Sequence, residues 1–155
     1  MNEDWPSLDG IAAQERELVF ARFTNDDAWA LGTAFVGVAQ ERGLPIAVQV
    51  SRSGQVLFHA AMPGTTPDND SWVARKARVV TRFGHSSLYM GQKARDAGKT
   101  FEEYFDVPIE EYAFHGGGFP LTISEVGVVG AIVVSGLPQL DDHALVVEVL
   151  RAHLA

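Results

Sequence analysis

Apolar and polar residues alternate with the period of a strand in some segments and with the period of a helix in others. Strand side chains point alternately to opposite faces, whereas one face of a helix recurs every three or four residues. The strand pattern covers segments 17–23, 46–52, 55–61, 112–115, 119–124 and 127–135. The helical pattern covers segments 7–16, 24–43, 71–83, 87–97, 100–104 and 141–154.

Turn and capping residues separate these segments and indicate how they connect. Ser53-Gly54 is a compact two-residue turn that predicts a hairpin. Segment 24–27 combines an N-cap threonine with acids in the first helical turn, and segment 68–71 is a similar cap for the next long helix. Hairpins on either side of helices predict an α+β fold, with helices packed on an antiparallel sheet of about five strands.

Composition bounds the class of protein. The 155 residues, 46% of them hydrophobic, suit a single domain spanning 1–155. A net charge of −8 disfavours nucleic-acid binding, which requires a basic face. The chain has no cysteine, which excludes disulfides and thiolate ligands. The acidic start and an apolar run of only Val126–Val134 argue against secretion and membrane insertion, so we expect a cytoplasmic protein.

A histidine before three glycines is the leading candidate site. His115 precedes Gly116, Gly117 and Gly118, and glycines let the backbone come close to a ligand. An imidazole at this position could ligate haem iron or carry a proton. The alternative is a strand-end histidine bonded to backbone, with glycines that serve only a tight turn.

The other histidines are weaker candidates. His85 lies at a helix break after Gly84, where it could face a cleft or cap the next helix. His59 lies on a predicted strand and becomes a ligand candidate if its side of the sheet faces a groove. His143 and His153 are interpreted as a helix N-terminal residue and a surface residue, without a role in a site.

The predicted helix 71–83 carries a basic stripe. Arg75, Arg78 and Arg82 are spaced by three and four residues, with Lys76 beside them. Such a stripe could bind carboxylates, including haem propionates. The alternative is ion pairing with the acidic segment 101–111.

Several strings resemble the GlcG/HbpS-like family of haem-binding or haem-degrading domains over nearly the whole chain. They are Gly117-Gly118-Phe119-Pro120, the strand Gly127 to Ser135, Ser135-Gly136 followed by Asp141 or Asp142, and the segments Phe58 to Asp70, Arg82 to Ser87 and Ser135 to Gln139. The resemblance implies a profilin-like architecture, a haem or related tetrapyrrole ligand, and a homo-oligomer. If haem binds, His115 is the first candidate for the iron ligand, because the chain has no cysteine and the three glycines let a flat macrocycle approach the backbone.

Three functions remain open at this point. The first is an oligomeric protein that binds a small ligand, with haem breakdown as a further activity. The second is an assembly protein whose aromatic residues form contact surfaces or ordinary core: Trp29, Trp72, Tyr89, Phe101, Tyr104 and Phe105. The third is an enzyme that holds a small carboxylic acid on the arginine stripe and uses His115 as a base.

Overall fold

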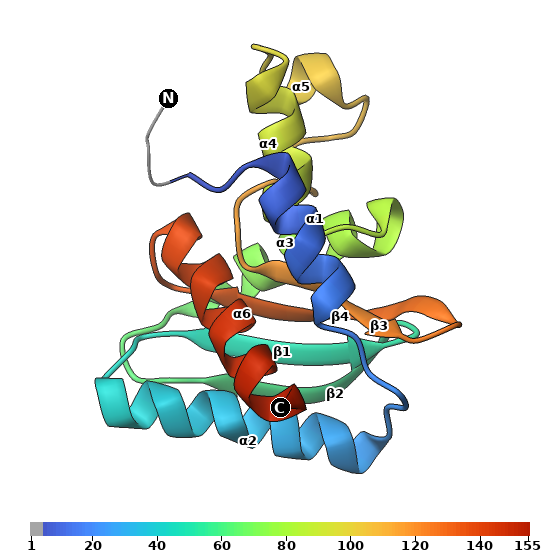
Figure 1. The fold of residues 1–155 in the computed structure, drawn as a ribbon. Helices are drawn as coiled ribbons and strands as arrows, with labels where there is room; N and C mark the ends of the chain where they lie inside the picture. The colour runs from blue at the N-terminus through green and yellow to red at the C-terminus, as the bar shows by residue number, and fades with distance from the viewer. Residues whose placement is uncertain (1–4) are drawn as a thin grey trace.

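Four antiparallel strands form one sheet in the order β2-β1-β4-β3 (Figure 1). The strands are β1 (Ala47–Arg52), β2 (Gln55–Ala61), β3 (Gly118–Ile123) and β4 (Gly127–Ser135). The computed structural model describes residues 5–155. Within them the α+β class predicted from the sequence is confirmed, with a sheet of four strands.

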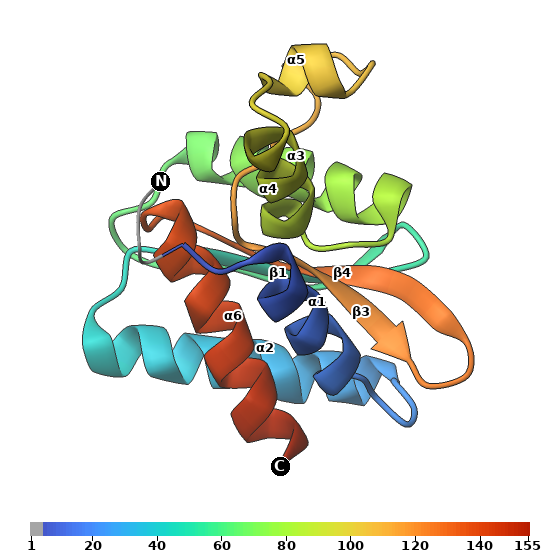
Figure 2. The same cartoon turned by 45° about the horizontal axis from the view of Figure 1, so that its top comes forward.

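Helices cover both faces of this sheet. Figure 2 shows α3 and α4 above the sheet and α2 and α6 below it, while α1 lies beside α6 and packs against α4. The six helices are α1 (Leu8–Glu17), α2 (Asn25–Arg42), α3 (Pro67–Phe83), α4 (Ser87–Asp96), α5 (Phe101–Tyr104) and α6 (Gln139–Leu154). None of the helices within residues 5–155 has both the length and the apolar character required to cross a membrane.

The alternation of side chains in the central strands separates two cores. Val48 of β1 and Ile132 and Val134 of β4 belong to the large core between the sheet and helices α2 and α6. Ala47 of β1 and Ala131 of β4 belong to a smaller core under α3. Because alanines are short, they let α3 lie close to the sheet, and this close packing shapes the site described below.

Capping and turn residues in the sequence correctly predicted where several elements begin and end. Thr24 and Asp27 form a capping box at the start of α2, in which the Thr24 backbone N–H donates to Asp27 Oδ2 over 2.7 Å. Ser53 and Gly54 both have positive φ, 52° and 80°, as a tight hairpin turn between β1 and β2 requires. The predicted hairpin is therefore confirmed.

Two predicted strands are absent, so the expectation of about five strands is corrected to four. In segment 17–23, α1 continues through Glu17, and only Phe20 makes an isolated bridge, to Ile123 of β3. Segment 112–115 is irregular, and the Ala113 N–H donates to the Arg75 carbonyl at 3.2 Å instead of to a strand. Apolar residues of both segments, such as Phe20 and Phe114, are buried in the cores without belonging to a strand.

The start of α3 also differs from the expectation. The N-cap is Thr66, and Pro67 occupies the first turn, so the helix begins ahead of the predicted 68–71 cap. Asn69 Oδ1 accepts from the Thr66 backbone N–H at 2.9 Å, which makes this residue part of the cap. A proline is well suited to the first turn because its missing N–H would have no helical partner there.

Candidate functional site

The glycine turn brings the backbone between α3 and α6. Gly117 has φ of 129°, and a Cβ atom there would collide with the Val134 carbonyl oxygen and lie 2.7 Å from Lys76 Nζ. A Cβ at Gly116 would collide with the Gln139 carbonyl oxygen. Both positions therefore require glycine, because side chains would push the turn away from the two helices.

His115 is held beside this turn in an aromatic setting. Its ring meets Trp72 edge-on at a centroid distance of 5.1 Å and Phe101 at 5.7 Å. Its Nδ1 atom is buried and has no hydrogen-bond partner among residues 5–155. Burial lowers the pKa of His115, and the nearby charges of Arg95, Lys76 and Arg75 lower it further. The imidazole is therefore neutral at pH 7, which is the form that ligates metals.

A buried ion pair lies on the other side of the turn. Lys76 Nζ donates to Asp142 Oδ2 and to the Val134 carbonyl, each at 3.0 Å, and Asp142 Oδ1 accepts from the Leu137 N–H at 3.0 Å. Burial lowers the pKa of Lys76, and the Asp142 carboxylate opposes that shift. Burial raises the pKa of Asp142 to about 6 against the opposing effect of Lys76.

These groups enclose a small polar cavity, which we call the His115 cavity. Its volume is about 240 Å³. Its lining residues come from α3, the glycine turn, the end of β4 and the start of α6: Asn69, Trp72, Lys76, His115, Ser135, Gly136, Leu137, Gln139 and Asp142. This volume lies below the roughly 300–1,000 Å³ typical of ligand pockets, so the cavity suits a compact ligand or one end of a larger one.

The structure does not bring the other two candidate histidines to this cavity. His85 Nδ1 lies 2.8 Å from Glu15 Oε1, and its ring stacks on Tyr89 at 4.2 Å. His59 on β2 lies between Gln49 and Asp70, with Nε2 3.0 Å from Asp70 Oδ1. Each of these histidines has a carboxylate partner on a different part of the surface.

The arginine stripe divides along α3. Arg75 stacks over Trp72 at 4.1 Å and so lies near the cavity, whereas Arg78 donates to the Glu111 carbonyl at 3.1 Å and Arg82 to the Tyr112 hydroxyl at 3.4 Å. Within residues 5–155, none of the three arginines is within ion-pair distance of a carboxylate. The alternative of ion pairing with segment 101–111 is therefore not observed within residues 5–155, and Arg78 and Arg82 donate to carbonyl and hydroxyl oxygens instead.

Sequence reasoning missed two groups. Lys76 lies beside the arginines of the basic stripe in the sequence, but it is 2% exposed, and its neighbours at three and four residues, Val73, Val79 and Val80, are all buried. His143 was assigned no role, but it is 4% exposed on the buried side of α6. One sequence signal could have identified both Lys76 and His143. Each is a polar residue spaced by three or four residues from the apolar residues of its helix, and so lies on the apolar face.

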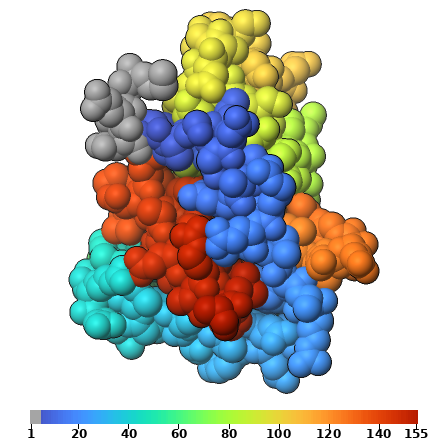
Figure 3. Space-filling model, viewed as in Figure 1, coloured from blue at the N-terminus to red at the C-terminus, as the bar shows by residue number. Residues whose placement is uncertain are grey.

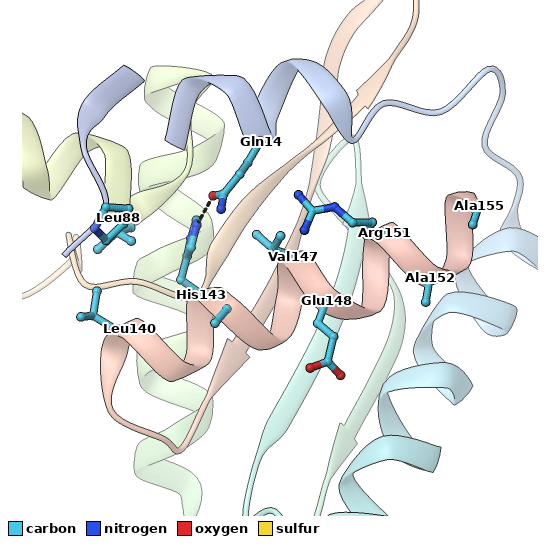
Figure 4. Close-up of a pocket in the computed structure, with 11 residues that line it drawn as sticks. Gln14, Leu88, Leu140, His143, Val147, Glu148, Arg151, Ala152 and Ala155 are labelled. Carbon is cyan, nitrogen blue, oxygen red and sulfur yellow. Dashed lines mark hydrogen bonds between the residues drawn. The ribbon is translucent and has the colours of Figure 1, made fainter. Parts of the chain in front are cut away.

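The His143 side chain lines a second, larger cavity of about 720 Å³ between α1 and α6 (Figure 4), which we call the α1–α6 cavity. His143 Nε2 bonds Gln14 Oε1 over 2.7 Å, and burial lowers the pKa of His143 to about 4. The wall is otherwise mainly aliphatic, with Leu88, Leu140 and Val147 among the lining residues.

Residues 23–151 match the model of the family described as haem degrading protein HbpS-like. This chain belongs to that family. A UPF0303 protein of Streptomyces coelicolor is 57% identical over 146 residues, covering 94% of this chain and 92% of the relative. The resemblance inferred from the sequence is therefore confirmed at the level of the family.

Solved structures share the fold. The crystal structure of the Ybr137w protein has a TM-score of 0.89 and 36% identity, covering 95% of this chain and 89% of that one. The crystal structure of a PduOC:heme complex has a TM-score of 0.69 and 18% identity, covering 86% of this chain and 95% of that one. At 18% identity the second comparison establishes the fold alone.

Proposed function

We propose that this HbpS-like protein binds a small ligand at the His115 cavity, and that the ligand is haem or a related tetrapyrrole. The observation that carries the proposal is the half-buried, neutral imidazole of His115 on the wall of a cavity between α3 and α6. The family description and the haem bound to the structurally similar PduOC support the same ligand class.

The residues fit haem through their chemistry. A neutral histidine is a common axial ligand of haem iron, and the chain has no cysteine that could replace it. The positive charges of Arg75 and Arg95 act on His115 and favour a ligand that carries carboxylates. Residues 5–155 contain no cluster of three His, Cys, Asp or Glu side chains arranged for a metal ion, and we assign iron one protein ligand, His115.

The cavity volume limits how the group is held. About 240 Å³ admits one end of a tetrapyrrole, so the remainder extends beyond the cavity. Trp72 and Phe101 supply aromatic surface at His115 for a flat ligand. A bound haem group would supply the chemistry of oxygen activation and electron transfer. The protein would orient the haem and control the access of water to it. Breakdown of the bound haem is the further activity in this proposal.

The test is a haem titration followed by absorption spectroscopy. We expect a sharp, saturable Soret band in the wild-type protein, a shifted band with weaker binding in His115→Ala, and an unchanged result in His153→Ala. A wild-type spectrum and affinity in His115→Ala would remove this residue from the ligand role. If His85→Ala and His59→Ala also behave like wild type, the assembly-protein hypothesis takes precedence.

A compact carboxylic acid is the second candidate ligand, favoured by the small volume and polar wall of the same cavity. In this alternative Arg75 supplies positive charge, because Lys76 is already paired with Asp142, and His115 acts as a base on the bound acid. The two candidates are distinguished by thermal melting. A melting temperature that rises with a small carboxylate, without a saturable Soret band after haem addition, supports this alternative.

A further inference from the structure

The α1–α6 cavity has the volume and the wall of a separate ligand site. Figure 3 shows α1 and α6 side by side on one face of the molecule, and the cavity between them measures about 720 Å³. This value lies within the roughly 300–1,000 Å³ of known ligand pockets. The aliphatic lining residues come from the segment before α1, from α4, from α6 and from the residue after α6: Pro6, Leu88, Leu140, Ala144, Val147, Ala152 and Ala155.

The charged groups that line this cavity are already neutralised by partners. Arg151 donates two hydrogen bonds to Glu17, at 2.7 and 2.8 Å. Glu148 accepts two from Arg42, at 2.6 and 3.2 Å. His143 is buried and uncharged at neutral pH, because burial lowers its pKa to about 4. Among residues 5–155, no side chain on this wall therefore offers an ionic ligand an unpaired opposite charge.

One polar pair reaches the aliphatic wall. In Figure 4, the side chain of Gln14 from α1 points toward His143 from α6, and 2.7 Å separates Oε1 from Nε2. The amide oxygen can only accept, so His143 Nε2 carries the proton and donates it. With its oxygen committed to His143, the Gln14 amide is fixed in orientation. Its nitrogen retains two N–H groups that can donate to another molecule.

We infer that the α1–α6 cavity binds an uncharged, mainly apolar small molecule whose single hydrogen-bond acceptor, such as a ketone oxygen, is held by the Gln14 amide. Burial of an aliphatic or aromatic body against the partly exposed Pro6 and Leu140 and the exposed Ala144 supplies the affinity. The hydrogen bond from the Gln14 amide selects for a ligand with an acceptor atom. An apolar molecule that has no acceptor leaves the Gln14 N–H groups unpaired. Haem carries two carboxylates, which matches the His115 cavity and not this one.

The test uses prodan, a neutral naphthalene ketone whose emission shifts to the blue in apolar surroundings. We expect saturable binding with a blue shift in the wild-type protein and loss of that signal in Ala144→Trp, which fills the cavity. Ala74→Trp, an exposed alanine on α3, is the matched control and should bind like wild type. Gln14→Leu should weaken binding by up to about tenfold, the effect of one hydrogen bond.

Three results would overturn the inference. They are the absence of saturable prodan binding in the wild type, equal binding in Ala144→Trp, and a change of subunit number in Ala144→Trp measured by light scattering. The last would assign the cavity to a contact between copies of the chain. Melting temperatures verify that each variant is folded. Because haem binding is assigned elsewhere, Ala144→Trp should keep the wild-type Soret response, so the two sites are tested independently.

Discussion

Lys76 Nζ lies 3.0 Å from Asp142 Oδ2, and 3% and 2% of the two side chains are exposed. The pair joins α3 to the start of α6. Lys76 also donates a hydrogen bond to the Val134 carbonyl, near the end of β4. Two buried charges lose their hydration on folding, and their mutual attraction, the bond to the Val134 carbonyl and the bond from the Leu137 N–H to Asp142 compensate for that loss. Because Lys76 and Asp142 both line the His115 cavity, the pair also holds two sides of its wall together.

Breaking this pair should cost more than replacing it. Lys76→Met and Asp142→Leu each leave one buried ionisable group without its partner, and each should lower the free energy of unfolding by about 3–5 kcal/mol. The double variant should lose much less than the sum of the two single losses. Urea denaturation of the four proteins of this cycle measures the coupling, and strictly additive losses would contradict it.

The stability of the protein should depend on pH through Asp142. Its pKa is raised from 3.8 to about 6, chiefly by burial. Between these values the folded state keeps a proton that the unfolded state has released. The contribution of this group is therefore present below about pH 4 and is lost as pH rises through about 6. We expect the free energy of unfolding of wild type, relative to Asp142→Asn, to decrease from pH 4 to pH 7.

The glycine turn should tolerate no side chain at Gly117. Gly117→Val combines a φ of 129° with a collision at Val134 and should lower stability by at least about 1–3 kcal/mol. Gly37→Val is the control, because a Cβ there meets nothing within 4 Å and the residue is exposed on α2. Equal melting temperatures for the two variants would show that the turn is unconstrained.

A homo-oligomer of at least two subunits remains a prediction. Trp29 on α2 is 65% exposed and Val126 is 69% exposed, so the surface presents large apolar groups. Phe105, by contrast, belongs to the core. We expect light scattering at micromolar concentration to give a mass of two or more chains, and Trp29→Glu to lower it while Gln40→Glu on the same helix does not. A monomer mass for the wild type would reject this prediction.

Local chemistry in the sequence determined the elements whose ends carry their own signal. The Thr24–Asp27 box, Gly43 and the Ser53-Gly54 turn were identified because a cap or a tight turn needs particular side chains or positive φ. The strand β4 occupies the predicted segment 127–135, an apolar run that contains two glycines. The glycines beside His115 also marked the turn where the cavity lies.

The tertiary structure decided which polar residues became buried. Lys76 and Arg75 are neighbours in sequence, yet the first bonds Asp142 across 66 residues and the second stacks on Trp72. The side of α3 that is buried depends on how the helix packs on the sheet. The sequence around Lys76 does not identify the distant carboxylate that compensates for burial of its charge. His143 likewise became a cavity residue because α1 supplied Gln14 from 129 residues away. Sequence patterns report local conformation and polarity, whereas desolvation and pairing depend on contacts that only the folded chain makes.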